Sequence, residues 1–166
     1  MVEPAIALFG ATFEEASRAL EDLLDETRAL YALLVDRKGF VLAHREAVWA
    51  ERPPELDSLA TLIAGNAAAT QALAELLGEE RFSEIVHQGK NRGIYVEEVS
   101  DLALLAVIFE PTTPVGKIKL VGKRTADRLR GIIKKAMADA SSARFTLDSE
   151  YTESASALID DLFGES

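Results

Sequence analysis

The most constraining feature of this 166-residue chain is a stretch from Ser58 to Ala74, 17 residues long, that carries no charged side chain. Seven of its residues are alanine, the best helix former, and Gly78 follows as a helix stop. The pattern predicts one long helix over residues 56–77. A membrane span is disfavoured, because the stretch is shorter than the ~20 apolar residues that cross a bilayer and contains several polar side chains.

A helical wheel centred on Leu59 divides this helix into two sides. The side expected to lie on a sheet carries most of the large apolar residues, Leu59, Leu62, Ile63, Leu73 and Leu77, together with the polar residues Asn66 and Thr70. The other side carries small or uncharged residues where a solvated helix normally has charges: Thr61, Ala64, Gly65, Ala68, Gln71 and Ala72. Two interpretations are open. The high alanine content serves only to favour the helix, or the helix is covered on both sides and Ala60, Ala64, Ala68 and Ala72 form a row of small side chains, an alanine ladder, that a second chain contacts. We favour the second interpretation, which predicts a dimer.

The rest of the chain alternates helical and strand patterns. Thr12 and Glu15 have the spacing of a capping box and predict the start of an amphipathic helix. Two apolar runs flank the turn residues Asp36 to Gly39 and predict a hairpin. Strands are expected at residues 30–35, 40–44, 82–88, 94–99 and 102–110, and a last helix at 118–137, before Ser141 and Ser142 interrupt the pattern. The all-apolar run 102–109 is expected in the middle of the sheet. The predicted fold class is α+β, a sandwich in the order α-β-β-α-β-β-β-α with a five-stranded antiparallel sheet.

Charge is distributed unevenly along the chain. The net charge is −10, so nucleic acid and anionic membranes are disfavoured as partners. Residues 117–135 nevertheless carry eight basic side chains and one acid, whereas every charge after Arg144 is negative. We therefore expect a folded domain over residues 1–140 and an acidic amphipathic tail over 141–166. A short tail helix would present an apolar face that either folds back toward the basic segment or docks a partner: Leu158, Ile159, Leu162 and Phe163.

The chain lacks the residue patterns of a self-contained active site. It has no cysteine, no glycine-rich phosphate loop, and two histidines, His44 and His87, without metal-ligand spacing. We therefore expect no catalytic residue, no metal and no cofactor, and a protein that acts on another protein in the cytoplasm.

Two segments carry a family resemblance. Residues 31–43, YALLVDRKGFVLA, and residues 59–70, LATLIAGNAAAT, resemble the Roadblock family of dynein light-chain relatives. Within this family the chain is most similar to the bacterial MglB subfamily, whose members regulate the Ras-like GTPase MglA in cell polarity and motility. The resemblance covers the chain from about Phe9 to the tail.

The resemblance implies a homodimer whose sheets join edge to edge and whose central helices lie side by side, with two chains docking one Ras-like GTPase. On this chain the residues that would face the GTPase or the neighbouring helix are Thr61, Ala64, Ala68, Gln71 and Ala72, together with Ala60 of the alanine ladder. It also implies GTPase activation without a donated arginine, although Arg37, Arg52 and Arg92 lie in predicted turns or loops. The alternatives are a passive Roadblock scaffold that leaves GTP turnover unchanged and a small-ligand sensor on a related sandwich fold.

Overall fold

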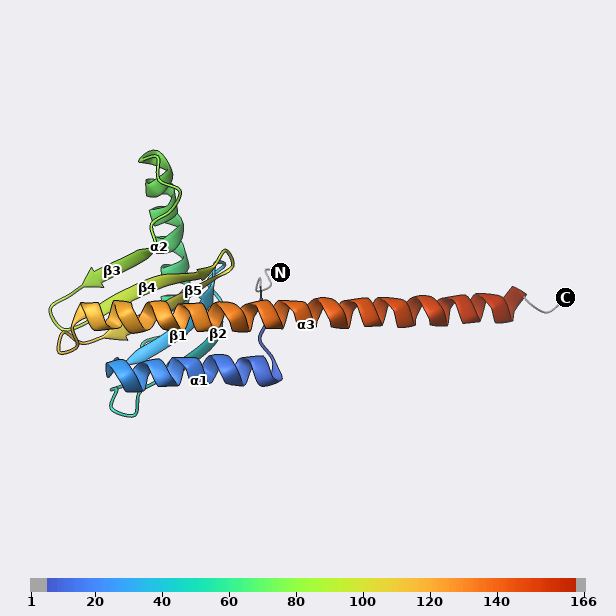
Figure 1. The fold of residues 1–166 in the computed structure, drawn as a ribbon, viewed down its shortest axis with the longest axis horizontal. Coiled ribbons are helices and arrows are strands. Elements are labelled where there is room, and N and C mark those ends of the chain that lie inside the picture. Colours follow the sequence, from blue (N-terminus) through green and yellow to red (C-terminus); the bar gives the residue numbers. More distant parts are fainter. Residues whose placement is uncertain (1–5, 164–166) are drawn as a thin grey trace.

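The computed structural model describes residues 6–163 and shows one antiparallel sheet with helices on both faces (Figure 1). The elements follow in the order α1 (Gly10–Thr27), β1 (Tyr31–Asp36), β2 (Val41–Glu46), α2 (Leu56–Leu76), β3 (Glu84–Gln88), β4 (Gly93–Ser100), β5 (Ala103–Phe109) and α3 (Val115–Phe163). The predicted fold class and the predicted order of elements are confirmed.

Strand β5 lies at the centre of the sheet, whose order is β2-β1-β5-β4-β3. All seven residues of β5 and all six of β1 are buried, because helices cover both faces of these strands. The central position predicted from the apolar run 102–109 is confirmed. The sheet ends in two edge strands, β2 and β3, and β3 is shorter than its neighbour β4.

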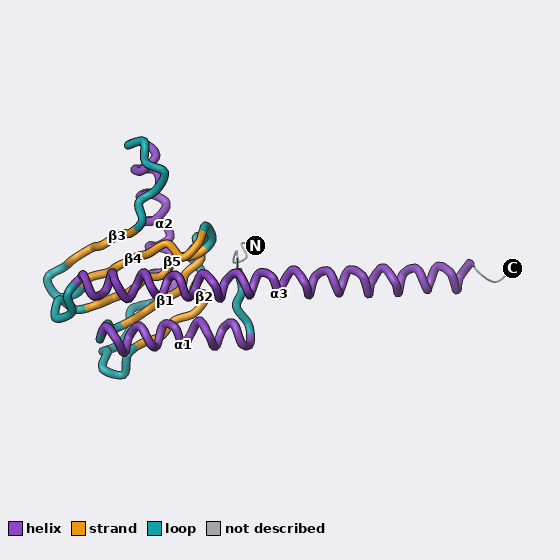
Figure 2. The backbone as a smooth tube through the Cα atoms, in the orientation of Figure 1, coloured by secondary structure: helices purple, strands orange, loops and turns teal. Residues whose placement is uncertain are grey.

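Helices lie on both faces of the sheet (Figure 2), and a layer of buried hydrophobic side chains holds them on each face. Helices α1 and α3 share one face, where Leu20 of α1 and Leu129 of α3 belong to the same buried cluster as Tyr95 of β4. Helix α2 covers the opposite face, where Ile63 belongs to a second cluster with Leu33 of β1. Burial of apolar surface in both layers is the main force that keeps the three layers together.

The turn between β1 and β2 is built as the sequence predicts. One carboxylate oxygen of Asp36 accepts hydrogen bonds from the backbone N–H of Lys38 (3.0 Å) and of Phe40 (2.9 Å). Gly39 has a φ of +93°, and a side chain there would come within 3.0 Å of Cα of Thr61 on α2. Glycine is needed for both reasons, and the turn therefore packs directly against the start of α2.

The start of α1 differs from the predicted capping box. The helix begins at Gly10, with Phe9 as its N-cap, and the Thr12 hydroxyl donates to the carbonyl of Phe9 at 2.9 Å. Thr12 therefore lies inside the first turn, where its side chain binds backward to the cap carbonyl and does not accept from an amide. Phe13, the next residue of this turn, is 39% exposed.

Helix α3 runs without interruption for 49 residues, so the predicted break at Ser141 and Ser142 is wrong. Serine lowers helix propensity by only a few tenths of a kcal/mol, and neither glycine nor proline occurs between Gly131 and Phe163. The buried residues of α3 end at Ala136. At ~1.5 Å per residue, the helix then projects roughly 40 Å from the domain, as Figure 1 shows. The predicted tail does not fold back, and its residues 164–166 lie outside the described residues.

Three of the eight basic side chains at the start of α3 form ion pairs with acidic residues of α1. Arg128 binds Asp22 at 2.8 Å, Lys135 reaches Glu15 at 3.3 Å, and Arg124 pairs with Glu26. These ion pairs explain how a strongly basic helix fits into an acidic protein. No helix in residues 6–163 is long and apolar enough to cross a bilayer.

Candidate functional site

Helix α2 contacts the sheet mainly through small side chains. Ala60 is completely buried, Ala67 and Ile63 are nearly so, and Ala74 is completely buried further along. Ala60, Ala67 and Ala74 repeat every seven residues and therefore form one narrow seam along the helix. Ala60 and Ala67 belong to the buried cluster between α2 and the sheet, where their small methyl groups let the helix backbone lie close to the strands.

The predicted orientation of α2 is wrong by about one residue, or ~100° of rotation. Ile63 faces the sheet as expected, but Leu62 and Leu73 are 70% and 56% exposed. The wheel assumed that the largest apolar side chains face the core. The side of α2 that carries Ala60, Ile63 and Ala67 faces the core instead.

The side of α2 away from the sheet is apolar and uncovered. We call this surface the outer face of α2; its residues are exposed in the structure and comprise Leu62, Gly65, Ala69, Ala72, Leu73 and Leu76. Leu76 is 83% exposed, and Glu75 is the only charged residue between Ser58 and Leu77. A contiguous apolar surface of this kind marks a site of contact with another chain.

The structure divides the six predicted site residues. Ala60 and Ala64 are buried on the side that faces the sheet, so they are unavailable to a partner in this fold. Thr61, Ala68 and Ala72 are exposed on or beside the outer face, and Gln71 is partly exposed. The predicted ladder of four alanines is therefore split between the two sides of the helix.

Sequence reasoning missed Leu62, Leu73 and Leu76 as surface residues. The available indication was the second seven-residue repeat, Leu62, Ala69 and Leu76, which runs opposite the alanine seam. Two parallel apolar repeats on one helix indicate a helix with two covered sides. Side-chain size alone does not tell which side faces the sheet.

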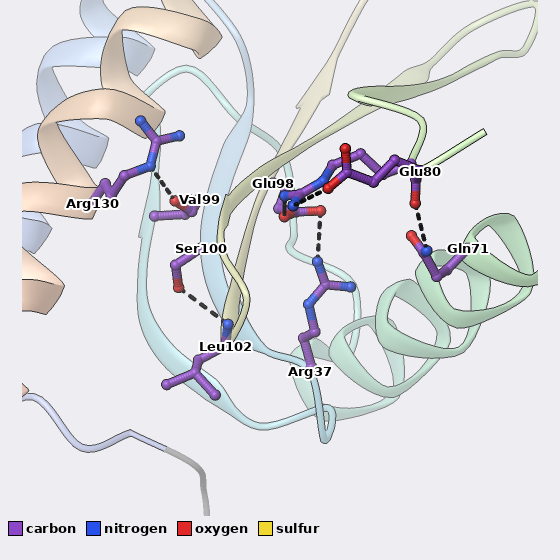
Figure 3. Close-up of polar contacts among 9 residues, drawn as sticks. Arg37, Gln71, Glu80, Glu98, Val99, Ser100, Leu102 and Arg130 are labelled. Atoms are coloured by element: carbon purple, nitrogen blue, oxygen red, sulfur yellow. Dashed lines mark hydrogen bonds and ion pairs between the residues drawn. The ribbon is translucent and has the colours of Figure 1, made fainter. Parts of the chain in front are cut away.

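An ion-pair network fixes the far end of α2 (Figure 3). Arg37, in the β1–β2 turn, binds the Glu98 carboxylate of β4 at 2.7 Å, and Arg81 pairs with the other oxygen of that carboxylate. Gln71 of α2 donates to the carbonyl of Glu80, next to Arg81, at 2.9 Å. The network connects α2, the β1–β2 turn and the loop before β3, and it holds the Arg37 guanidinium against the sheet.

The described residues contain no group of three or more His, Asp or Glu side chains placed to hold a metal ion. Of the two histidines, His87 lies 3.4 Å from the side-chain oxygen of Asn66 on α2, and both rings are exposed.

Comparison with known proteins identifies the fold family. The sequence model of the Roadblock/LC7 domain matches residues 15–109, from within α1 to the end of β5. The chain belongs to the Roadblock/LC7 family. A search of curated proteins gave no match.

Solved structures of MglB are similar to this Roadblock protein over most of its length. Gliding protein MglB from Thermus thermophilus is 60% identical, with a TM-score of 0.79, and the match covers 81% of this chain and 100% of that one. An MglB structure described as having a tetrameric arrangement gives the same identity and TM-score and is covered to 99%. Myxococcus xanthus MglB is 28% identical, with a TM-score of 0.71 and coverage of 79% and 96%. About a fifth of this chain extends beyond these matches.

Proposed function

We propose that this Roadblock protein is a homodimeric activator of a Ras-like, MglA-type small GTPase in the cytoplasm. The outer face of α2 carries the proposal, because it is an exposed apolar surface on a helix whose other side is already packed. The similarity of the chain to MglB over four fifths of its length supports the same class of partner. The protein acts as a regulator, with no catalytic residue of its own in the GTPase reaction.

The exposed apolar surface of α2 supports the proposed homodimer. Three exposed leucines and the alanines between them amount to a few hundred Å², worth on the order of 5 kcal/mol at ~25 cal/mol per Å² before the cost of association. That energy contributes to a dimer but needs further contacts, which the edge strands β2 and β3 are positioned to supply. In the proposed complex two chains present their α2 helices to one GTPase.

The activation mechanism that we propose uses no donated arginine. Of the three candidate arginines, Arg37 is held by Glu98 and is only 31% exposed, which supports this view. Arg52 and Arg92 are exposed in loops and remain available for a direct test. A supplied arginine finger is worth ~10³-fold or more in rate. An Arg52→Ala or Arg92→Ala variant that retains its activity within a few-fold would support repositioning of the GTPase's own catalytic groups.

We further propose that the end of α3 docks the partner. Leu158, Ile159, Leu162 and Phe163 are 55–82% exposed, and the straight helix carries them away from their own domain. Acidic residues interleave with them, so the segment has the amphipathic pattern of a helix that binds a groove.

Single-turnover GTP hydrolysis tests the proposal most directly. The GTPase is first captured from extract with a non-hydrolysable GTP analogue, and its hydrolysis is then measured with and without this protein. Ala68→Arg places a charge beside the outer face and is expected to abolish acceleration. The matched control is Ala138→Arg, an equally simple change at an exposed alanine of α3, which is expected to retain it.

Two outcomes would contradict the proposal. Binding of the GTPase without any acceleration by the wild-type protein would assign the passive scaffold function instead. Equal acceleration by Ala68→Arg and wild type would remove α2 as the docking surface. Sedimentation at micromolar concentration tests the homodimer separately, and a purely monomeric protein would contradict it.

A further inference from the structure

A cavity lies on the opposite side of the sheet from the outer face of α2. Its volume is about 670 Å³, and it is bounded by the end of β4, the β4–β5 turn and the part of α3 that includes Ile133 and Met137. Cavities of ~300–1,000 Å³ are the size that binds small molecules.

The cavity exists because β3 is shorter than β4. Strand β3 begins at Glu84, which pairs with Glu97, so the last residues of β4 have no neighbouring strand on that side. Arg130 of α3 donates to the carbonyl of Val99 at 2.7 Å, as Figure 3 shows. This contact occupies an acceptor at the uncovered end of β4 and disfavours an added peptide strand there.

The cavity has a carboxyl group in its wall. Glu97 is 9% exposed, and its side chain accepts one hydrogen bond, from the hydroxyl of the fully buried Tyr95. Among residues 6–163 no cation forms an ion pair with Glu97, because the neighbouring Lys119 and Arg130 pair with Glu84 and Asp127 instead. Burial raises the pKa of Glu97, and the hydrogen bond from Tyr95 and the charges of Lys123 and Arg130 offset this only in part. The carboxylate is therefore desolvated without a counter-ion in contact.

The other charges around the cavity are compensated or lie at its rim. Glu98 is bound by two arginines, and Arg130 is bound by Asp127 at 2.6 Å. Lys134 and Asp101, of opposite sign, are exposed and screened by solvent. The interior combines one uncompensated carboxylate with an apolar wall that includes Leu102, Ile133 and Met137.

We propose that this cavity binds a small organic cation, with an ammonium or guanidinium group at Glu97 and an apolar body along Leu102, Ile133 and Met137. Such a ligand supplies the counter-ion that the buried carboxylate lacks and covers the apolar wall. The site lies between the end of β4 and α3, apart from the outer face of α2.

Three probes of the same shape test the charge requirement: 4-phenylbutylammonium, 4-phenylbutanol and 4-phenylbutyrate. Binding to the full chain is measured by NMR titration at neutral pH. The ammonium probe is expected to bind at least 10-fold more tightly than the other two. Equal affinity for all three probes, or binding by none of them, would overturn the proposal.

Variants locate the site. Glu97→Gln keeps an acceptor for Tyr95 but removes the charge, and it is expected to weaken binding of the ammonium probe at least 10-fold. Glu110→Gln changes an exposed carboxylate outside the cavity and is expected to leave binding unchanged. Met137→Trp fills the cavity from a side chain that is 45% exposed, so this variant is also expected to lose binding, with Glu97 unchanged.

The same titration tests whether the cation comes from a small molecule or from a protein side chain. A blocked tripeptide with a central lysine presents the same ammonium group on a protein chain. If it binds 10-fold more tightly than 4-phenylbutylammonium, the occupant is a protein side chain and the small-molecule proposal is wrong. Unchanged affinity in both Glu97→Gln and Met137→Trp would also reject the cavity as the site.

Discussion

Gly122 is the point of closest contact between α3 and the sheet. A Cβ placed on Gly122 would overlap Cε1 of Tyr95 and lie 3.2 Å from two further atoms of that ring. Tyr95 is fully buried and its hydroxyl is bonded to Glu97, so the ring has little freedom to move aside. Gly122→Ala is therefore expected to destabilise the fold although alanine is the better helix former.

The size of this effect follows from two opposing contributions. Alanine in place of glycine inside a helix gains about 1 kcal/mol. Overpacking of a rigid core site costs about 1–3 kcal/mol, and the overlap with the Tyr95 ring places this site at the upper end of that range. Gly122→Ala is thus expected to lose about 2 kcal/mol of unfolding free energy. That corresponds to a fall in Tm of roughly 4–8 °C for a domain of this size.

Gly131 provides a matched control on the same helix. A Cβ at Gly131 meets no heavy atom within 4 Å, so Gly131→Ala is expected to gain about 1 kcal/mol. Urea unfolding of both variants at one fixed protein concentration measures the difference, which is expected to be about 3 kcal/mol. If Gly122→Ala is as stable as Gly131→Ala, the close packing of α3 on Tyr95 is wrong.

Two further predictions concern the buried carboxyl and the helical tail. Because burial raises the pKa of Glu97 above its unfolded value of 4.5, its contribution to stability is fully present below that value and is lost as the pH rises through the folded pKa. Glu97→Gln is expected to be more stable than wild type at neutral pH and to lose that advantage near pH 4.5, as urea unfolding across this range would show; parallel pH profiles would contradict it. Leu162→Glu changes a side chain that is 76% exposed, so the free energy of unfolding is expected to change by less than about 0.5 kcal/mol. The affinity of this variant for the GTPase, measured by calorimetric titration, is expected to fall at least 10-fold. Wild-type affinity in this variant would exclude the tail from docking.

The local chemistry of the chain was sufficient to predict its architecture. The turn at Asp36 and Gly39 is specified by residues within four positions of each other, and the structure confirms it. The central strand β5 was predictable because an uninterrupted apolar run is stable only when both faces are covered. In contrast, the end predicted for α3 was wrong, since two serines without glycine or proline are insufficient to stop a helix.

The sequence was sufficient to predict which helix carries the candidate site, but not which side of that helix is exposed. The absence of charge on α2 indicates two covered sides, but it does not say whether Ala60 or Leu62 faces the sheet. That choice depends on how closely the helix approaches β1 and β4, which is a property of the assembled layers. For the same reason Ala64 was predicted to be available to a partner and is instead buried.

The sequence by itself determined the order of elements, the central strand, the hairpin turn and the presence of an uncharged helix, because short-range periodicity and backbone preferences specify each of them. Only the tertiary structure decided the rotation of α2, the arginine network around Glu98 and the cavity at Glu97. These features join residues that are distant in sequence, such as Arg37 and Glu98, and no local pattern records which distant groups a folded chain brings together.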